Sequence, residues 1–233
     1  MKEIISEAIR NIALVGHGGS GKTSLSEIIL YTTKETNRIG KIEDGNTTSD
    51  YTPNEIEKQI SISSSLMNVE WNNNKINIID APGFSDFVGD VKSALKVCDT
   101  AVMVIKSAEG IEVGTEAAKS IIDGYNLPSS IIINKVDSEH STFLDTYENI
   151  KSRMHPGATI ITFPVTEGVN FNGVVDVISM KVYTFGEAGS RKVSEAELTG
   201  ELKEQAENYK TQLIEKVAEY SEDLMNKYFE EGS

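Results

Sequence analysis

The stretch "NIALVGHGGSGKTSLSEIILY", residues 11–31, decides the fold. A short apolar run at 11–15 leads into a glycine-rich loop at 16–23, and a helix-forming stretch follows at 24–31. The loop fits the pattern G-x-x-x-x-G-K-[ST], and its place between a strand and a helix predicts a phosphate-binding loop. In such a loop successive backbone N–H groups point at one anion, and the helix N-terminus adds positive potential.

Two side chains of this loop carry chemistry. Lys22 can reach the β- and γ-phosphates of a nucleotide, and the hydroxyl of Thr23 can ligate Mg²⁺. We expect His17 to space the backbone rather than to catalyse. The predicted nucleotide-binding residues of the loop are Gly16, His17, Gly18, Gly19, Ser20, Gly21, Lys22 and Thr23.

Further apolar runs extend the fold outward from this unit. Residues 76–79, 101–105 and 131–133 are short, rich in β-branched side chains and followed by loops and helix-length stretches, as buried parallel strands are. The segment "NVEWNNNKINII", residues 68–79, instead predicts an antiparallel hairpin that turns at 72–74. The sequence therefore predicts an α/β fold of the P-loop NTPase type: a mostly parallel sheet with one antiparallel edge strand and helices on both faces.

A second polar cluster follows one of these strands, in "NIIDAPGFSDF", residues 77–87. Asp80 ends the strand, so its carboxylate can reach the same Mg²⁺, through a water. The N–H of Gly83 can bond to a γ-phosphate and lose that partner on hydrolysis, which is how nucleotide switches work. The residues predicted to line the site here are Asp80, Ala81, Pro82 and Gly83.

The motif "IIINKVD", residues 131–137, decides which base is bound. Asp137 can accept both the N1–H and the 2-amino group of guanine, and charge-assisted bonds of this kind are worth ~1.5–3 kcal/mol each. Asn134 can hold the loop and the purine edge, and the Lys135 stem can cover the ring. The motif predicts GTP rather than ATP as the ligand, which disfavours a P-loop ATPase.

Composition and charge exclude several classes of protein. The 233 residues carry a net charge of −14, so broad binding of a nucleic-acid backbone is not expected, and any RNA contact is local or made by a protein partner. No run of eighteen apolar residues and no secretory signal is present. Cys98 is the only cysteine, so no internal disulfide can form, and we expect a buried, inert thiol. We expect a cytoplasmic protein that binds neither DNA nor membranes.

The texture of the sequence changes after residue 157. Residues 159–193 hold β-rich runs separated by glycines, and a stripe of apolar residues then recurs every three or four positions from Leu202 to Tyr228, on one helix or a helix pair. A stripe of this kind is more often core than a partner-binding groove. We predict a GTP-binding domain at 1–157 and a small α+β appendage at 158–233.

Three segments together resemble the translational GTPases, and most closely elongation factor G and its divergent relatives. They are "RNIALVGHGGSGKTSLSEIILY" (10–31), "RIGKIEDGNTTSDYTPNEIEKQISIS" (38–63) and "INIIDAPGFSDFVGDV" (76–91). The resemblance implies that 1–157 is a G domain and 158–233 its G′ insert. It also implies GTP-driven work on the ribosome, further domains beyond residue 233, a contact of the G′ region with the ribosomal stalk protein, and a monomer.

The resemblance also implies roles for single residues, and the sequence departs from the family at three of them. Ser61 stands for the usual threonine of the first switch and keeps the hydroxyl that Mg²⁺ needs, so the implied metal ligands are Thr23, Ser61 and Asp80. Gly19 replaces a usual aspartate that can contact a monovalent cation. Phe84 replaces the histidine that orients the attacking water, and a phenyl ring can neither donate nor accept that hydrogen bond.

A fourth feature of the family is absent from this sequence. The Ser-Ala strand end that completes the guanine site in the family is missing, because the one Ser-Ala-x-Gly, residues 107–110, precedes the guanine motif. We therefore expect 1–157 to lack its last strand and helix, the insert to be truncated, and guanine nucleotides to bind more weakly than to a full-length protein.

These observations lead to two hypotheses for function. The first is an Mg²⁺-dependent GTPase, slow in isolation, in which Lys22, Asp80 and Gly83 carry the chemistry and Phe84 stands at the place of the family histidine. The second is a GTP-gated ribosome-binding module with negligible hydrolysis. Phe84 and Gly19 favour the second, and the intact set of Lys22, Thr23, Ser61 and Asp80 favours the first.

Overall fold

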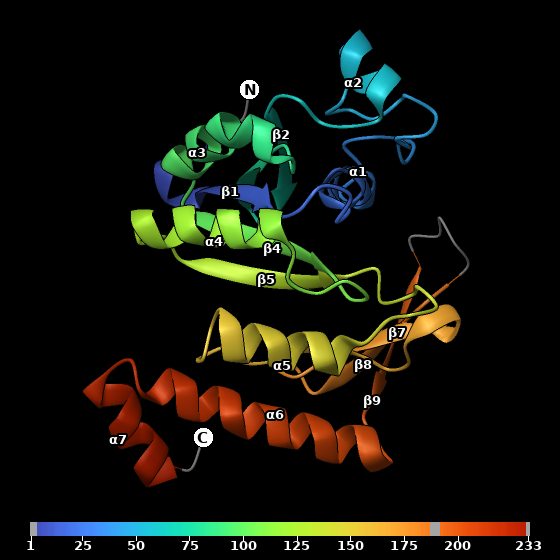
Figure 1. Cartoon of the computed structure of the whole chain (residues 1–233). Coiled ribbons are helices and arrows are strands. Elements are labelled where there is room, and N and C mark those ends of the chain that lie inside the picture. Colours follow the sequence, from blue (N-terminus) through green and yellow to red (C-terminus); the bar gives the residue numbers. More distant parts are fainter. Residues whose placement is uncertain (1–3, 187–191, 232–233) are drawn as a thin grey trace. The chain divides into compact units, whose positions relative to one another are not determined.

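The computed structural model describes residues 4–186 and 192–231 (Figure 1). The chain divides into two compact units, Met1–Lys135 and Val136–Ser233. Each unit has its own sheet, of five strands in the first and four in the second. The domain boundary that the sequence predicts near Gly157 lies inside the second unit and stays a prediction.

The first unit is an α/β layer structure built on a sheet of order β2-β3-β1-β4-β5. The pairs β1–β3, β1–β4 and β4–β5 are parallel, and the edge strand β2 is antiparallel to β3. The predicted fold class is therefore confirmed. Its elements are η1 (Ser6–Ala8), β1 (Ile9–Val15), α1 (Lys22–Thr32), α2 (Pro53–Lys58), β2 (Ser65–Trp71), β3 (Asn74–Asp80), η2 (Ser85–Phe87), α3 (Val88–Val97), β4 (Thr100–Lys106), α4 (Val113–Tyr125) and β5 (Ser129–Asn134).

The hairpin between β2 and β3 forms where the asparagines predict it. Asn72 and Asn73 both have positive φ, 47° and 61°, and asparagine tolerates this left-handed conformation better than most residues do. Trp71 pairs with Asn74 across the turn. Two consecutive left-handed residues match the twist of a hairpin, so the turn fixes the register of the edge strand.

Side chains alternate between the two faces of the central strands. On one face Leu14, Met67 and Ile78 pack with Leu30 of α1, and Ile12 and Val102 lie against this cluster. The intervening residues Ala13 and Val15 of β1 are fully buried, since α3 contacts β1 and α4 contacts β4 (Figure 1). Burial on both faces explains why the central strands are continuous apolar runs.

The strand order brings two chemical segments together. β1 lies between β3 and β4, and Leu14 of β1 is in register with Asp80 of β3. The carboxyl ends of parallel strands meet at one edge of a sheet, so the loop after β1 and the end of β3 are neighbours.

In the residues that the structure describes, the second unit is a four-stranded antiparallel sheet with three α-helices and one short 3-10 helix, and it includes the predicted helix pair as α6 and α7. Phe163 and Tyr209 of this unit meet edge to face with ring centroids 5.3 Å apart. No helix in the described ranges is both long and apolar enough to cross a bilayer. The elements of the second unit are α5 (Phe143–Arg153), β6 (Thr162–Pro164), η3 (Gly168–Asn170), β7 (Gly173–Asp176), β8 (Lys181–Phe185), β9 (Val193–Glu197), α6 (Gly200–Ala218) and α7 (Glu222–Glu231).

Candidate nucleotide-binding site

The glycine-rich loop connects the end of β1 to the first turn of α1. Gly21 caps α1 with φ 97°, a conformation that L side chains rarely adopt, and a Cβ there would collide with the amide of Asn134. That amide donates to the carbonyl of Ser20 at 2.9 Å. The last turn of the loop is thus fixed from the end of β5, the role that the sequence predicts for Asn134.

Lys22 lies under the loop rather than on the surface. Its ammonium donates to the carbonyls of Gly16 and His17 at 3.0 and 2.9 Å, and the side chain is almost fully buried. Burial lowers the pKa of Lys22 to about 8, against the opposing pull of Asp80 and two further carboxylates. A buried ammonium with little solvation is well placed to bind an anion such as a phosphate.

The three predicted metal ligands meet at one point. The hydroxyl of Thr23 donates to Asp80 Oδ2 at 2.7 Å and lies 3.2 Å from the hydroxyl of Ser61. These residues come from three separate segments, which are α1, the end of β3 and the residues after α2. The fold therefore assembles a cluster of oxygen atoms beside the glycine-rich loop.

This cluster fits a hard cation such as Mg²⁺. Asp80 Oδ1 is buried and has no hydrogen-bond partner within the described residues, and the same is true of Asp50 Oδ2. Burial raises the pKa of Asp80 to about 6, although the bond from Thr23 and the charge of Lys22 oppose this rise. Magnesium prefers oxygen ligands and binds through one or two carboxylates together with waters and phosphates. Thr23, Ser61 and Asp80 supply such oxygens, and the group of three His, Cys, Asp or Glu side chains typical of other metals does not occur in the described ranges.

Asp50 is a site residue that sequence reasoning missed. It is buried next to the cluster, and burial is the main cause that raises its pKa. Hydrogen bonding with Ser61 and the charge of Lys22 oppose this rise, and the charges of Glu55 and Glu27 add to it. The sequence offers only an indirect signal, the capping box that begins two residues later at Thr52 and starts α2. That signal marks a helix start and does not show that Asp50 turns toward the oxygen cluster.

His17 bridges the loop to α4. Its Nδ1 accepts from the N–H of Gly114 at 3.2 Å, and its Nε2 lies 3.3 Å from a carboxylate oxygen of Glu112. Since Nδ1 is an acceptor, the neutral ring carries its proton on Nε2. Both contacts tie the loop to the start of α4, and the predicted spacing role of His17 stays a prediction.

Gly83 and Phe84 pack directly on the loop. A Cβ at Gly83 would come within 2.5 Å of Lys22 Nζ and 2.7 Å of the backbone N of Gly18. A Cβ at Gly18 would in turn lie 2.9 Å from two ring carbons of Phe84. The ring, 42% exposed, therefore covers the loop at Gly18 and presents only apolar atoms there.

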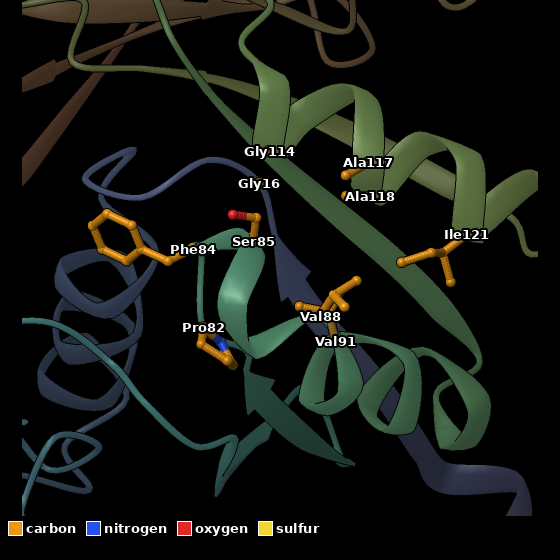
Figure 2. A pocket seen from close by; sticks show the side chains of 11 residues that line it. Gly16, Pro82, Phe84, Ser85, Val88, Val91, Gly114, Ala117, Ala118 and Ile121 are labelled. Atoms are coloured by element: carbon orange, nitrogen blue, oxygen red, sulfur yellow. The ribbon is translucent and has the colours of Figure 1, made fainter.

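Behind this segment lies an apolar pocket, and Phe84 is one of the residues at its edge. Figure 2 shows the side chains of Val88, Val91 and Ile121 gathered between the neighbouring helices, while Phe84 points away from them toward the loop. Pro82 and Gly114 also line the pocket. The sequence gives no hint of this pocket, because α3 and α4 meet only in the tertiary structure.

The guanine motif crosses the division between the two compact units. Asn134 ends β5 and Lys135 follows with φ 57°, both in the first unit. Asp137 belongs to the second unit, so its reading of the base stays a prediction. The structure thus brings together the predicted residues of the loop and of the Asp80–Phe84 segment, with Ser61 and Asn134 beside them.

Known proteins resemble this chain in sequence and in structure. Residues 7–228 match the family described as the elongation factor Tu GTP binding domain. Proteins named elongation factor G from Granulibacter bethesdensis and Gluconobacter oxydans are each 36% identical, over 97% and 100% of this chain but 33% and 34% of their own length. A crystal structure of a protein from Thermus thermophilus superimposes with a TM-score of 0.89 at 33% identity, over 96% of this chain and 33% of that one. The chain spans about a third of the length of the relatives that it matches.

Proposed function

The chain belongs to the family of elongation factor Tu GTP-binding domains, and from that premise we propose that it binds and hydrolyses GTP as the G domain of an elongation factor G-like protein. The observation that carries the proposal is the cluster of Thr23, Ser61 and Asp80, with one Asp80 oxygen left unpaired beside the buried ammonium of Lys22. Burying a carboxylate oxygen without a hydrogen-bond partner costs free energy. A bound cation and the neighbouring ammonium of Lys22 would offset that cost.

Each residue has a distinct part in this proposal. Lys22 binds the β- and γ-phosphates after leaving the carbonyls of Gly16 and His17. Thr23, Ser61 and Asp80 would hold Mg²⁺, which would neutralise phosphate charge when bound. Gly83 packs closely against Lys22 and Gly18, and its N–H would contact the γ-phosphate.

The second candidate function, a GTP-gated binding module with negligible turnover, is favoured by Phe84. Its ring stands on Gly18, where the family resemblance places the residue that orients the attacking water. No polar atom of Phe84 can position or deprotonate that water. We propose that hydrolysis by the isolated chain is slow for this reason.

The wider role follows from the relatives. The relatives are named elongation factor G, so we propose that the chain works in a cytoplasmic translation factor, monomeric, whose G′ region contacts the ribosomal stalk protein. Residues 158–233 would form that G′ insert. A net charge of −14 agrees with a contact made through a protein partner rather than through broad binding of RNA.

Nucleotide titrations and single-turnover kinetics test the proposal. Fluorescent GTP and GDP should bind the chain in an Mg²⁺-dependent way and ATP should not compete, while Asp137→Asn should shift the preference toward xanthine nucleotides by exchanging an acceptor for a donor. Equal affinity for ATP and GTP contradicts the guanine assignment. GTP hydrolysis by the full-length protein with and without ribosomes separates the two functions, because the binding module should show no stimulation.

A further inference from the structure

We propose that Glu55 is the positioning residue that holds Ser61 at the cation cluster, and that it thereby favours the GTP-bound over the GDP-bound state. The inference rests on the proposed function for its nucleotide-dependent part. Glu55 lies in α2, outside the glycine-rich loop, and the sequence by itself indicates no role for it in nucleotide binding.

Both carboxylate oxygens of Glu55 are engaged, and they bind different segments. Oε1 accepts from the backbone N–H groups of Ile62 and Ser63 at 3.1 and 3.3 Å. Oε2 accepts from the hydroxyl and the N–H of Thr52 at 2.6 and 3.2 Å. One side chain therefore joins the start of α2 to the residues directly after Ser61.

The burial of Glu55 shows that this link is not a chance surface contact. The residue is only 2% exposed, and acidic side chains are almost never so buried unless they are paired. No basic side chain makes an ion pair with it in the described ranges; four donors from three residues take that place. Only an ionised carboxylate can accept from all four, because an amide would turn two of its hydrogens toward other donors.

The position of Ser61 depends on this link. Ser61 follows the left-handed Gln59 that ends α2 and precedes the two N–H groups held by Glu55. Its hydroxyl reaches to 3.2 Å from that of Thr23. With the backbone on one side of Ser61 tied to α2, the hydroxyl is held in place before any cation binds.

The consequence is a difference between nucleotides. In the proposed function Ser61 would help to hold Mg²⁺ when a γ-phosphate is present, and GDP lacks that phosphate. A loss of Glu55 should weaken the binding of a non-hydrolysable GTP analogue and leave the binding of GDP nearly unchanged. A capping residue that only stabilised α2 would have no reason to distinguish the two ligands.

The test compares Glu55→Gln with Glu57→Gln in the full chain. Glu57 lies on the same helix and makes only an exposed ion pair with Lys58, so it is a matched control. Titration with the fluorescent analogue and with fluorescent GDP at saturating Mg²⁺ should show about a tenfold loss for the analogue in Glu55→Gln, as expected for the loss of one or two bonds to a charged group. GDP affinity should change less than about twofold, and Glu57→Gln should change neither.

Two further variants separate positioning from capping. In a Ser61→Ala background, Glu55→Gln should cause no additional loss of affinity for the analogue, since its effect runs through that hydroxyl. Thr52→Ala breaks the capping box and keeps the bonds to Ile62 and Ser63, so it should affect the analogue less than Glu55→Gln does. Equal losses for the analogue and for GDP, or additive losses with Ser61→Ala, overturn the inference.

Amide hydrogen exchange of the nucleotide-free chain gives a readout that needs no ligand. The N–H groups of Ile62 and Ser63 should exchange about tenfold faster in Glu55→Gln than in Glu57→Gln. Unchanged exchange would overturn the anchoring role even if the chain binds GTP. Failure of the unaltered chain to bind either nucleotide would instead overturn the proposed function, and the exchange rates would still decide on Glu55.

Discussion

The two segments that flank the oxygen cluster are held in opposite ways. The first switch, residues 38–63, is tied by buried carboxylates: Glu27 of α1 accepts from the N–H groups of Gly40, at 2.9 Å, and of Thr48, and Glu55 accepts from Ile62 and Ser63. The second switch, residues 80–88, is held after Asp80 by close packing, with Gly83 and Phe84 pressed on the loop.

The difference shows what each kind of contact can do. Hydrogen bonds to backbone N–H groups are directional, so they place a polar atom such as the Ser61 hydroxyl. Close packing has no such direction, and it determines which groups and which solvent molecules are kept out. We therefore propose that the first switch presents a ligand and that the second controls access to the loop.

The largest effect is expected at Phe84. In the full-length protein on ribosomes, Phe84→His should raise the single-turnover rate of GTP hydrolysis at least about tenfold, since positioned proton-handling groups contribute ~10²–10⁴-fold. GTP affinity should stay within about twofold. Phe84→Leu is the control, because it alters the ring and adds no polar group, so it should not raise the rate. An equal increase of the hydrolysis rate in both variants would show that the ring of Phe84 only blocks the site sterically.

Close packing in the second switch is tested next, at Gly83. A methyl group there would press on Lys22 Nζ and on the backbone of Gly18, which cannot move aside, so Gly83→Ala should lower GTP affinity at least about tenfold. Gly89→Ala, in the following helix, meets no atom within 4 Å and should leave affinity unchanged. Isothermal titration of both variants makes the comparison, and similar affinities would show that the second switch is not tightly packed.

A smaller effect links Gly18 to Phe84. In the original chain Gly18→Ala should destabilise by about 1–3 kcal/mol, the usual cost of overpacking, because the new Cβ meets the ring. In a Phe84→Ala background the same change should cost much less. Chemical denaturation of the four proteins gives the coupling energy, and a coupling energy of zero would mean that the ring does not rest on Gly18.

The smallest effect is expected in the first switch, at Gln59. This residue has φ 55°, a conformation that costs a non-glycine residue about 1–2 kcal/mol. Glycine removes that cost, but part of the stabilisation is lost because glycine also makes the unfolded chain more flexible. Gln59→Gly should therefore stabilise the nucleotide-free chain by roughly 0.5–1 kcal/mol in thermal or chemical unfolding. Gln205→Gly in α6 is the control and should destabilise by a similar amount. Destabilisation by Gln59→Gly would show that the glutamine side chain makes contacts that the first switch needs.

Local patterns in the sequence were sufficient to predict the sheet of the first unit and the loops at its edge. The loop from Gly16 to Thr23, the apolar runs and the paired asparagines predicted the parallel sheet, its antiparallel edge and the place of Asp80. Each of these signals lies within a few neighbouring residues, because strand burial, turn conformation and phosphate binding by backbone N–H groups all depend on short segments.

Only the tertiary structure shows which side chains hold these strands and loops in place. Nothing near Asp50 or Glu27 in the sequence shows that their carboxylates turn inward, and nothing near Phe84 shows that its ring rests on Gly18, in a distant part of the chain. The sequence identified Ser61 only through resemblance, and it did not identify Glu55, which holds the residues beside it. A buried carboxylate is stabilised by donors that the fold brings to it, and a side chain packs on atoms that the fold places beside it, so neither contact leaves a local pattern.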